Sequence, residues 1–172
     1  MQKVFGFILI LIGCSGLGVW YSMQFRLHIY NLKQMCHILC MLENYVRFGR
    51  STMGECCGMI AGRVENPFRS GLEEIAVEMK KNEGSTLGQV SRKSLMKHLK
   101  KIVVSQREKE EFIACFEQEG YEDEGMQIQS IIRGRQELEA AWQELNVSLS
   151  SRCRLAISLG TMSGLLLVVL FL

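Results

Sequence analysis

The chain has few of the residues that interrupt helices, and it has no pattern typical of strands. Of its 172 residues, Pro67 is the only proline. Turn dipeptides are few, and no apolar run alternates with polar residues for long enough to form a half-buried strand. Together these absences point to helices, so we predict an all-α fold.

Motifs for catalysis and nucleotide binding are also missing. The sequence contains neither a Walker phosphate loop nor a G-x-G-x-x-G fingerprint. No metal-ligand motif surrounds any of the three histidines, which are His28, His37 and His98. We therefore predict a protein that is not an enzyme and that has no catalytic residues, metal ligands or cofactor.

The chain also has no large excess of positive or negative charge. All 18 acidic residues and 19 of the 20 Lys and Arg lie within residues 26–154, so this segment is nearly neutral. Near neutrality argues against nucleic-acid binding, which needs a strongly basic face. A carboxylate run is typical of a solvated helix face: Glu108, Glu110 and Glu111. Lys97, Lys100 and Lys101 form a small basic face. We interpret it as facing solvent, and the alternative is contact with anionic lipid or an acidic partner.

Both ends of the chain are long uncharged runs. Residues 4–25 and 155–172 contain no charged side chain. As helices they would reach roughly 33 and 27 Å, close to the ~30 Å of a bilayer's hydrocarbon core. We therefore predict an N-terminal transmembrane anchor (1–25), a helical domain (26–154) and a C-terminal transmembrane helix (155–172).

The N-terminal run has a second interpretation. Residues 11–14 resemble a lipoprotein cleavage box, with Cys14 as the acylated residue and the domain outside the cytoplasm. The apolar run continues through Trp20 and Tyr21, however, which favours an uncleaved anchor with an interfacial aromatic belt. Lys3 is the only basic residue on the far side of the anchors, so the positive-inside rule predicts a cytoplasmic domain. The basic residues on the domain side are Arg26, Lys33, Arg133, Arg135, Arg152 and Arg154.

The seven cysteines lack the spacing of a disulfide framework. We interpret them as free thiols that act as small apolar core residues in a reducing compartment. A metal site formed by Cys36, His37, Cys40 and the Cys56–Cys57 pair is the alternative, although the C-x-x-C pairs of a zinc ribbon are absent.

Apolar spacing and capping signals divide the domain into six helices. The first apolar stripe runs from Leu27 to Val46, and capping boxes at Thr52–Glu55 and Ser105–Glu108 open two later helices. Asn66-Pro67 starts another helix, residues 82–86 form a loop, and Gly120 ends the fifth helix. We predict an antiparallel six-helix bundle whose first and last helices are continuous with the transmembrane helices.

Small residues in the terminal runs indicate helix packing. Gly160 and Gly164 form a G-x-x-x-G motif around Ser163, and Gly18 lies in a second small-residue face with Cys14. Such residues let two helix backbones approach closely. The two terminal helices could therefore pack on each other or on a partner.

The two-anchor layout resembles the stage III sporulation protein AB family over the whole chain. The resemblance is carried by the C-terminal sequence Leu159-Gly160-Thr161-Met162-Ser163-Gly164-Leu165-Leu166-Leu167, and by Gly120, Asp123 and Gln127 at the start of the last long helix. The family usually has Leu-Gly before that helix, whereas this chain has Glu119-Gly120.

The resemblance implies a non-enzymatic platform. Members of the family are similar to the cytoplasmic domain of type II secretion and type IV pilus platform proteins, a six-helix bundle. They belong to a secretion-like channel complex between mother cell and forespore. The expected location is the mother-cell membrane that faces the forespore. The implied partners are membrane lipid, a secretion-type ATPase (stage III sporulation protein AA) on the cytoplasmic side, other channel components, and further copies of the chain.

Overall fold

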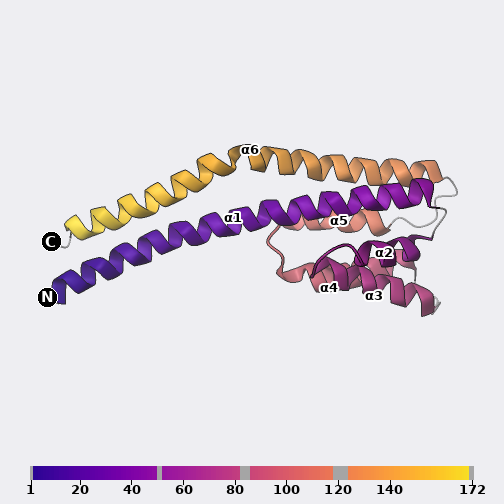
Figure 1. The fold of residues 1–172 in the computed structure, drawn as a ribbon, viewed down its shortest axis with the longest axis horizontal. Helices are drawn as coiled ribbons and strands as arrows, with labels where there is room; N and C mark the ends of the chain where they lie inside the picture. The colour runs from indigo at the N-terminus through magenta and orange to yellow at the C-terminus, as the bar shows by residue number, and fades with distance from the viewer. Residues whose placement is uncertain (1, 50–51, 82–85, 118–123, 171–172) are drawn as a thin grey trace. The chain divides into compact units, whose positions relative to one another are not determined.

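The computed structural model describes residues 2–49, 52–81, 86–117 and 124–170. Every regular element within these ranges is a helix (Figure 1), so the all-α prediction is confirmed. The elements are α1 (Gln2–Phe48), α2 (Met53–Ala61), α3 (Phe68–Lys81), α4 (Leu87–His98), the short 3-10 helix η1 (Leu99–Lys101), α5 (Gln106–Glu117) and α6 (Glu124–Leu170). The predicted cap Gly120 and nearly all of the predicted loop 82–86 lie outside the described residues.

The chain divides into two compact units. We call Asn31–Trp142 the lobe, and we call Met1–Tyr30 together with Gln143–Leu172 the terminal unit. The 47-residue helices α1 and α6 each contribute to both units.

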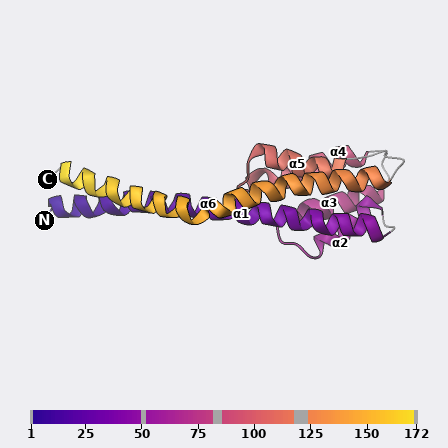
Figure 2. The ribbon, with the colours of Figure 1, turned by 90° about the horizontal axis from the view of Figure 1, so that it is seen from above.

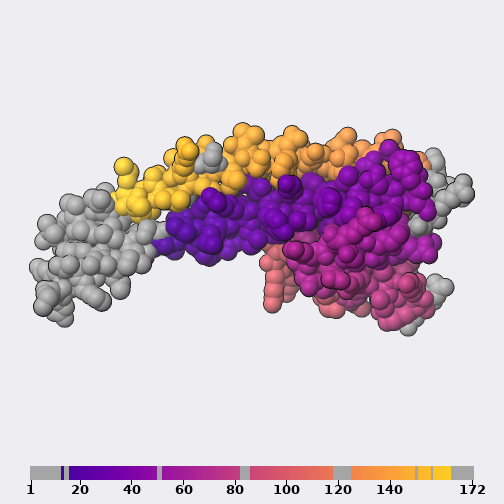
Figure 3. Space-filling model, viewed as in Figure 1, coloured from indigo at the N-terminus to yellow at the C-terminus, as the bar shows by residue number. Residues whose placement is uncertain are grey.

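In the lobe, the helices α2 to α5 pack in chain order, each against the next (Figures 1 and 2). Aromatic rings pack together in the core. The centre of the Phe112 ring lies 6.0 Å from the centre of the Phe68 ring and 5.2 Å from the centre of the Phe116 ring. Side chains from α1 complete the core at helical spacing, and they are Leu32, Met35, Leu39 and Leu42, all fully buried. Burying each such side chain contributes roughly 1.5–3 kcal/mol, so the α1 stripe fixes α1 within the lobe. In the space-filling view, side chains close the spaces between these ribbons on the visible face (Figure 3).

The predicted capping boxes are present at the N-termini of two short helices, α2 and α5. The Thr52 backbone N–H donates to Glu55 Oε2 (2.9 Å), and the Glu55 N–H donates to Thr52 Oγ1 (3.4 Å). The same pair of bonds joins Ser105 and Glu108, at 2.7 and 3.2 Å. Both capping boxes are therefore confirmed. The predicted restart at Asn66-Pro67 lies one residue early, since α3 begins at Phe68, a difference usual at helix ends.

Two glycines allow elements of the lobe to approach closely. A Cβ on Gly134 of α6 would overlap Cys115 Sγ of α5. A Cβ on Gly88 of α4 would lie 2.9 Å from the Glu117 carbonyl oxygen of α5, closer than real Cβ atoms come. Gly88, which weakens α4 as a helix former, is thus needed for packing.

The terminal unit has a small buried interior and a large apolar surface. Gly18, Ser22 and Ile29 of α1 and Cys153 of α6 are buried, and the Arg152 guanidinium lies 5.5 Å from the centre of the Phe25 ring. Exposed apolar and aromatic side chains include Leu17, Trp20, Tyr21, Met23, Leu155, Leu159 and Met162.

The structure does not confirm the predicted membrane spans. Among the residues that it describes, no helix carries a stretch long and apolar enough to cross a bilayer. The two spans, the domain boundaries tied to them and the six-helix count of the bundle stay predictions.

Candidate functional site

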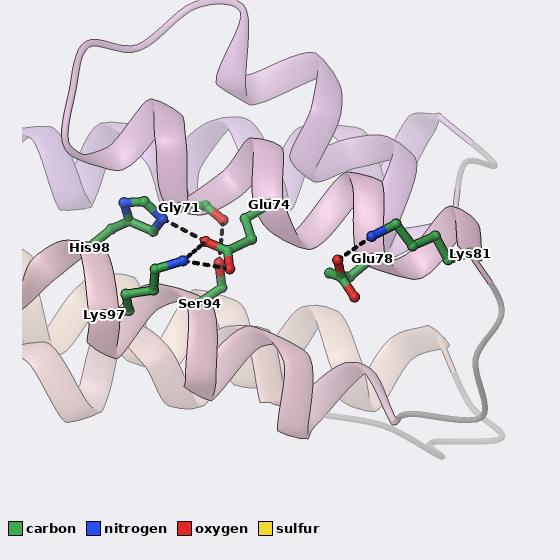
Figure 4. A network of polar contacts seen from close by, with 7 residues as sticks. All are labelled: Gly71, Glu74, Glu78, Lys81, Ser94, Lys97 and His98. Carbon is green, nitrogen blue, oxygen red and sulfur yellow. Dashed lines mark hydrogen bonds and ion pairs between the residues drawn. The ribbon is translucent and has the colours of Figure 1, made fainter.

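A charged network joins α3 to α4 on the surface of the lobe (Figure 4). Lys97 Nζ donates to both carboxylate oxygens of Glu74, at 3.0 and 3.1 Å, and His98 Nε2 lies 2.6 Å from Glu74 Oε2. Beneath them, Ser94 Oγ donates to the Gly71 carbonyl oxygen at 3.1 Å. Hydrogen bonds from Lys97, and next from His98, lower the pKa of Glu74. The network therefore fixes α3 against α4 with an ionised carboxylate at its centre.

A polar cavity adjoins this network. It has a volume of about 300 Å³, and Glu74, Glu78 and Lys93 supply its charges. Two of these three are already paired, because Lys81 Nζ contacts Glu78 Oε1 at 2.7 Å and Glu74 binds Lys97. A cavity whose carboxylates are neutralised in this way favours structural support of the lobe over strong binding of a charged ligand.

A second cavity, lined by Met96 of α4 and by residues of η1 and α5, has a different character. Its volume is about 290 Å³, and it combines the buried side chains of Leu99 and Ile113 with the lysines Lys100 and Lys109. Among the residues described, no carboxylate pairs with either lysine. We call this cavity the α4–α5 pocket. It can take one apolar side chain flanked by carboxylates.

The lysines of the predicted basic face thus have different surroundings. Lys97 is paired with Glu74, whereas Lys100 and Lys101 are exposed on η1. The predicted carboxylate run also has local roles, since Glu108 caps Ser105. Gln106 donates to Glu110 at 2.9 Å, and Arg107 donates to Glu111 at 2.7 Å.

The cysteines of the lobe are free thiols in a mainly apolar setting. Cys56, Cys57 and Cys115 are buried, and Cys40 is exposed. Burial raises the pKa of Cys36 to about 11 and the pKa of both Cys57 and Cys115 to about 12. Thiols held protonated in this way are poor nucleophiles and poor metal ligands.

The alternative metal site gains no support. In the described part of the chain, no three His, Cys, Asp or Glu side chains gather as metal ligands would. The site proposed from Cys36, His37, Cys40, Cys56 and Cys57 therefore has no structural counterpart there. The side chain of Cys14, the residue of the lipoprotein alternative, lies outside the described part.

The predicted packing glycines lie in the terminal unit. Gly18 is buried in α1 and Gly160 is half-buried in α6, while Gly164 belongs to α6 but its surroundings lie outside the described part. Ser163 Oγ donates to the Gly160 carbonyl at 3.0 Å, so its hydroxyl bonds within its own helix. The role of these glycines in assembly stays a prediction.

The fold and these surfaces define an all-α protein of the helical-bundle class. The chain belongs to the stage III sporulation protein AB family, whose sequence model matches residues 3–172. A solved structure of a stage III sporulation protein AB is similar, with a TM-score of 0.65 and 18% identity over 72% of this chain and 97% of that chain. At this identity, the likeness to the solved structure shows the fold alone. No curated protein sequence matches the chain.

Family membership supports a role in sporulation, and the family is not a known family of enzymes. The residues that carried the resemblance, however, are not those that form the cavities of the lobe. The α4–α5 pocket and the Glu74 network each join residues from different helices. Of these residues, the sequence singles out only the lysines of the predicted basic face, Lys97 and Lys100.

Proposed function

We propose that the chain is a non-enzymatic membrane platform in a sporulation-specific, secretion-like channel complex. In this proposal the terminal unit anchors the chain in the mother-cell membrane that faces the forespore. The lobe lies in the cytoplasm and binds a secretion-type ATPase of the same complex, stage III sporulation protein AA. The chain would couple that ATPase to the other channel components.

The observation that carries this proposal is the contrast between the surfaces of the two units. Acidic residues are absent from residues 1–30, and Glu144 is the only one in residues 143–172, where large apolar side chains such as Leu159 and Met162 are 65% and 73% exposed. Exposed apolar surface of this extent is typical of a membrane or protein interface. The surface of the lobe, in contrast, carries paired charges such as Glu74–Lys97 and Glu117–Arg92.

Within the lobe, the α4–α5 pocket supports the proposed binding of a partner. It offers an apolar floor, formed by Leu99 and Ile113, and two lysines that no described carboxylate neutralises. Interface hot spots commonly have this form, with an anchor side chain in a pocket and charges at its edge. We assign the contact with the ATPase to this pocket.

The test is recovery of the ATPase with the full-length chain from sporulating cells. Wild type should retain the ATPase, and the double change Lys100→Glu and Lys109→Glu should lose most of it. The single change Lys80→Glu, at an exposed position in the last turn of α3, is the control and should leave recovery unchanged. Failure of wild type to recover the ATPase would refute the platform proposal, whereas full recovery by the double variant would refute only the assigned surface.

A further inference from the structure

An apolar groove lies on the surface of the terminal unit. Its volume is about 540 Å³, within the roughly 300–1,000 Å³ of small-molecule sites. Its lining residues recur along one face of α1 and are completed by one residue of α6: Val19, Ser22, Met23, Arg26, Leu27, Tyr30 and Ile157. We call it the terminal groove.

The groove is amphipathic along its length. Val19 and Met23 line its N-terminal part, while Arg26 and Tyr30 lie one and two turns further along α1. Leu27 and Tyr30 are 45% and 48% exposed, so the surface is open to a ligand. An apolar trough therefore ends beside a cation and a phenol.

The charge around the groove favours an anion. Among the residues described, no carboxylate forms an ion pair with Arg26. Arg152 and Arg154 of α6 belong to the same unit, whose only acidic residue is Glu144. A guanidinium without a carboxylate partner is well suited to bind phosphate, to which it donates two parallel hydrogen bonds.

We propose that the terminal groove binds an anionic phospholipid, with an acyl chain along Val19, Met23 and Leu27 and the headgroup phosphate on Arg26. This inference rests on the proposed membrane location and names the lipid that the terminal unit would select. A soluble phosphate would leave the apolar part of the groove empty. A second copy of this chain would bring its own Arg26 to a surface that has no carboxylate to receive it, so repulsion disfavours that occupant.

The test uses the full-length chain in vesicles, with Trp20 as the reporter. Trp20 is 60% exposed and follows Val19 of the groove, and Trp142→Phe removes the other tryptophan. Vesicles of dioleoylphosphatidylcholine and dioleoylphosphatidylglycerol are prepared with bromine on one lipid or on the other. Brominated phosphatidylglycerol should quench Trp20 more strongly than brominated phosphatidylcholine at equal mole fraction.

Three variants isolate the role of Arg26. Arg26→Gln should lower the enrichment of phosphatidylglycerol near Trp20 about fivefold, the effect expected of one basic residue at an anionic surface. Arg26→Lys should keep most of the enrichment, because the charge remains. Arg154→Gln is the matched control, since it removes the same charge from the same unit at a position that does not line the groove. It should lower the enrichment clearly less than Arg26→Gln does, and an equal loss would refute a site at Arg26.

Each other outcome overturns the proposal in a recognisable way. Equal quenching by the two lipids in a chain that incorporates into vesicles would refute lipid selection while leaving the anchoring proposal intact. Protection of Trp20 from both lipids, together with cross-linked dimers, would place a second copy in the groove. Absence of any incorporation would refute the anchoring itself, and the lipid site with it.

Discussion

The change Gly134→Ala tests how closely α5 and α6 pack in the lobe. A methyl group at Gly134 would overlap Cys115 Sγ, and it would lie 4.0 Å from the Glu111 carbonyl oxygen. Cys115 is only 3% exposed, and its thiol donates to that same carbonyl at 3.3 Å. The sulfur can therefore move away only by leaving its hydrogen bond or by pushing the helices apart.

The expected loss of stability follows from two opposing terms. Overpacking a core of this kind typically costs about 1–3 kcal/mol. Replacing glycine with alanine inside a helix stabilises it by about 1 kcal/mol, because alanine has the higher helix propensity. We therefore expect Gly134→Ala to lower the free energy of unfolding by about 1 kcal/mol, measured by urea denaturation of the full chain in detergent.

Removal of the sulfur should reverse the sign of the effect. In a Cys115→Ala background the clash is gone, so Gly134→Ala should stabilise the protein by up to about 1 kcal/mol through helix propensity alone. Gly58→Ala in α2 is the matched control, because its Cβ would meet Ala76 Cβ at an ordinary 3.4 Å. If Gly134→Ala stabilised the wild-type chain as Gly58→Ala does, the result would contradict the close contact of Gly134 in α6 with Cys115 in α5.

Three further predictions concern charge, thiols and the terminal helices. The pKa of Glu74 is lowered in the folded state. The ionised Glu74 therefore contributes to stability above the pKa that it has in the unfolded chain, and this contribution is lost as pH falls through the folded pKa. Glu74→Gln should flatten the acid limb of a plot of melting temperature against pH. The pKa of Cys57 is raised to about 12, so stability should decline as pH rises from about 9 towards 12, and Cys57→Ala should make that decline shallower in the same measurement. Gly164→Ile should keep membrane localisation but reduce partner recovery and spore yield, scored separately with a fluorescent fusion; normal values for both would make the glycines incidental.

Local features of this fold could be predicted from the sequence. The capping boxes at Thr52 and Ser105 depend on residues three positions apart, so the sequence itself carries their geometry. The helical stripe that includes Met35 and Leu39 was predicted for the same reason. The close approach of Gly88 to the Glu117 carbonyl, in contrast, depends on tertiary packing, which no local pattern encodes.

The sites that depend on distant residues could not be predicted. Glu74 and His98 are 24 residues apart, and the terminal groove joins Val19 to Ile157. One sequence carries no periodic signal that pairs such positions, because the pairing depends on how whole helices pack. The sequence predicts a basic face from the lysines near residue 100, but only the fold separates Lys97, which is paired, from Lys100, which lines a pocket.

Thiol labelling at the native Cys40 tests the central claim, a platform with its lobe in the cytoplasm. Cys40 is exposed, whereas burial keeps the pKa of Cys36, Cys57 and Cys115 high and their thiols unreactive at neutral pH. A membrane-impermeant maleimide should label the full-length chain only after the cells are permeabilised, and Cys40→Ser should remove most of that labelling. Labelling of Cys40 in intact cells would place the lobe outside the cytoplasm, away from any ATPase, and would favour a lipoprotein acylated at Cys14.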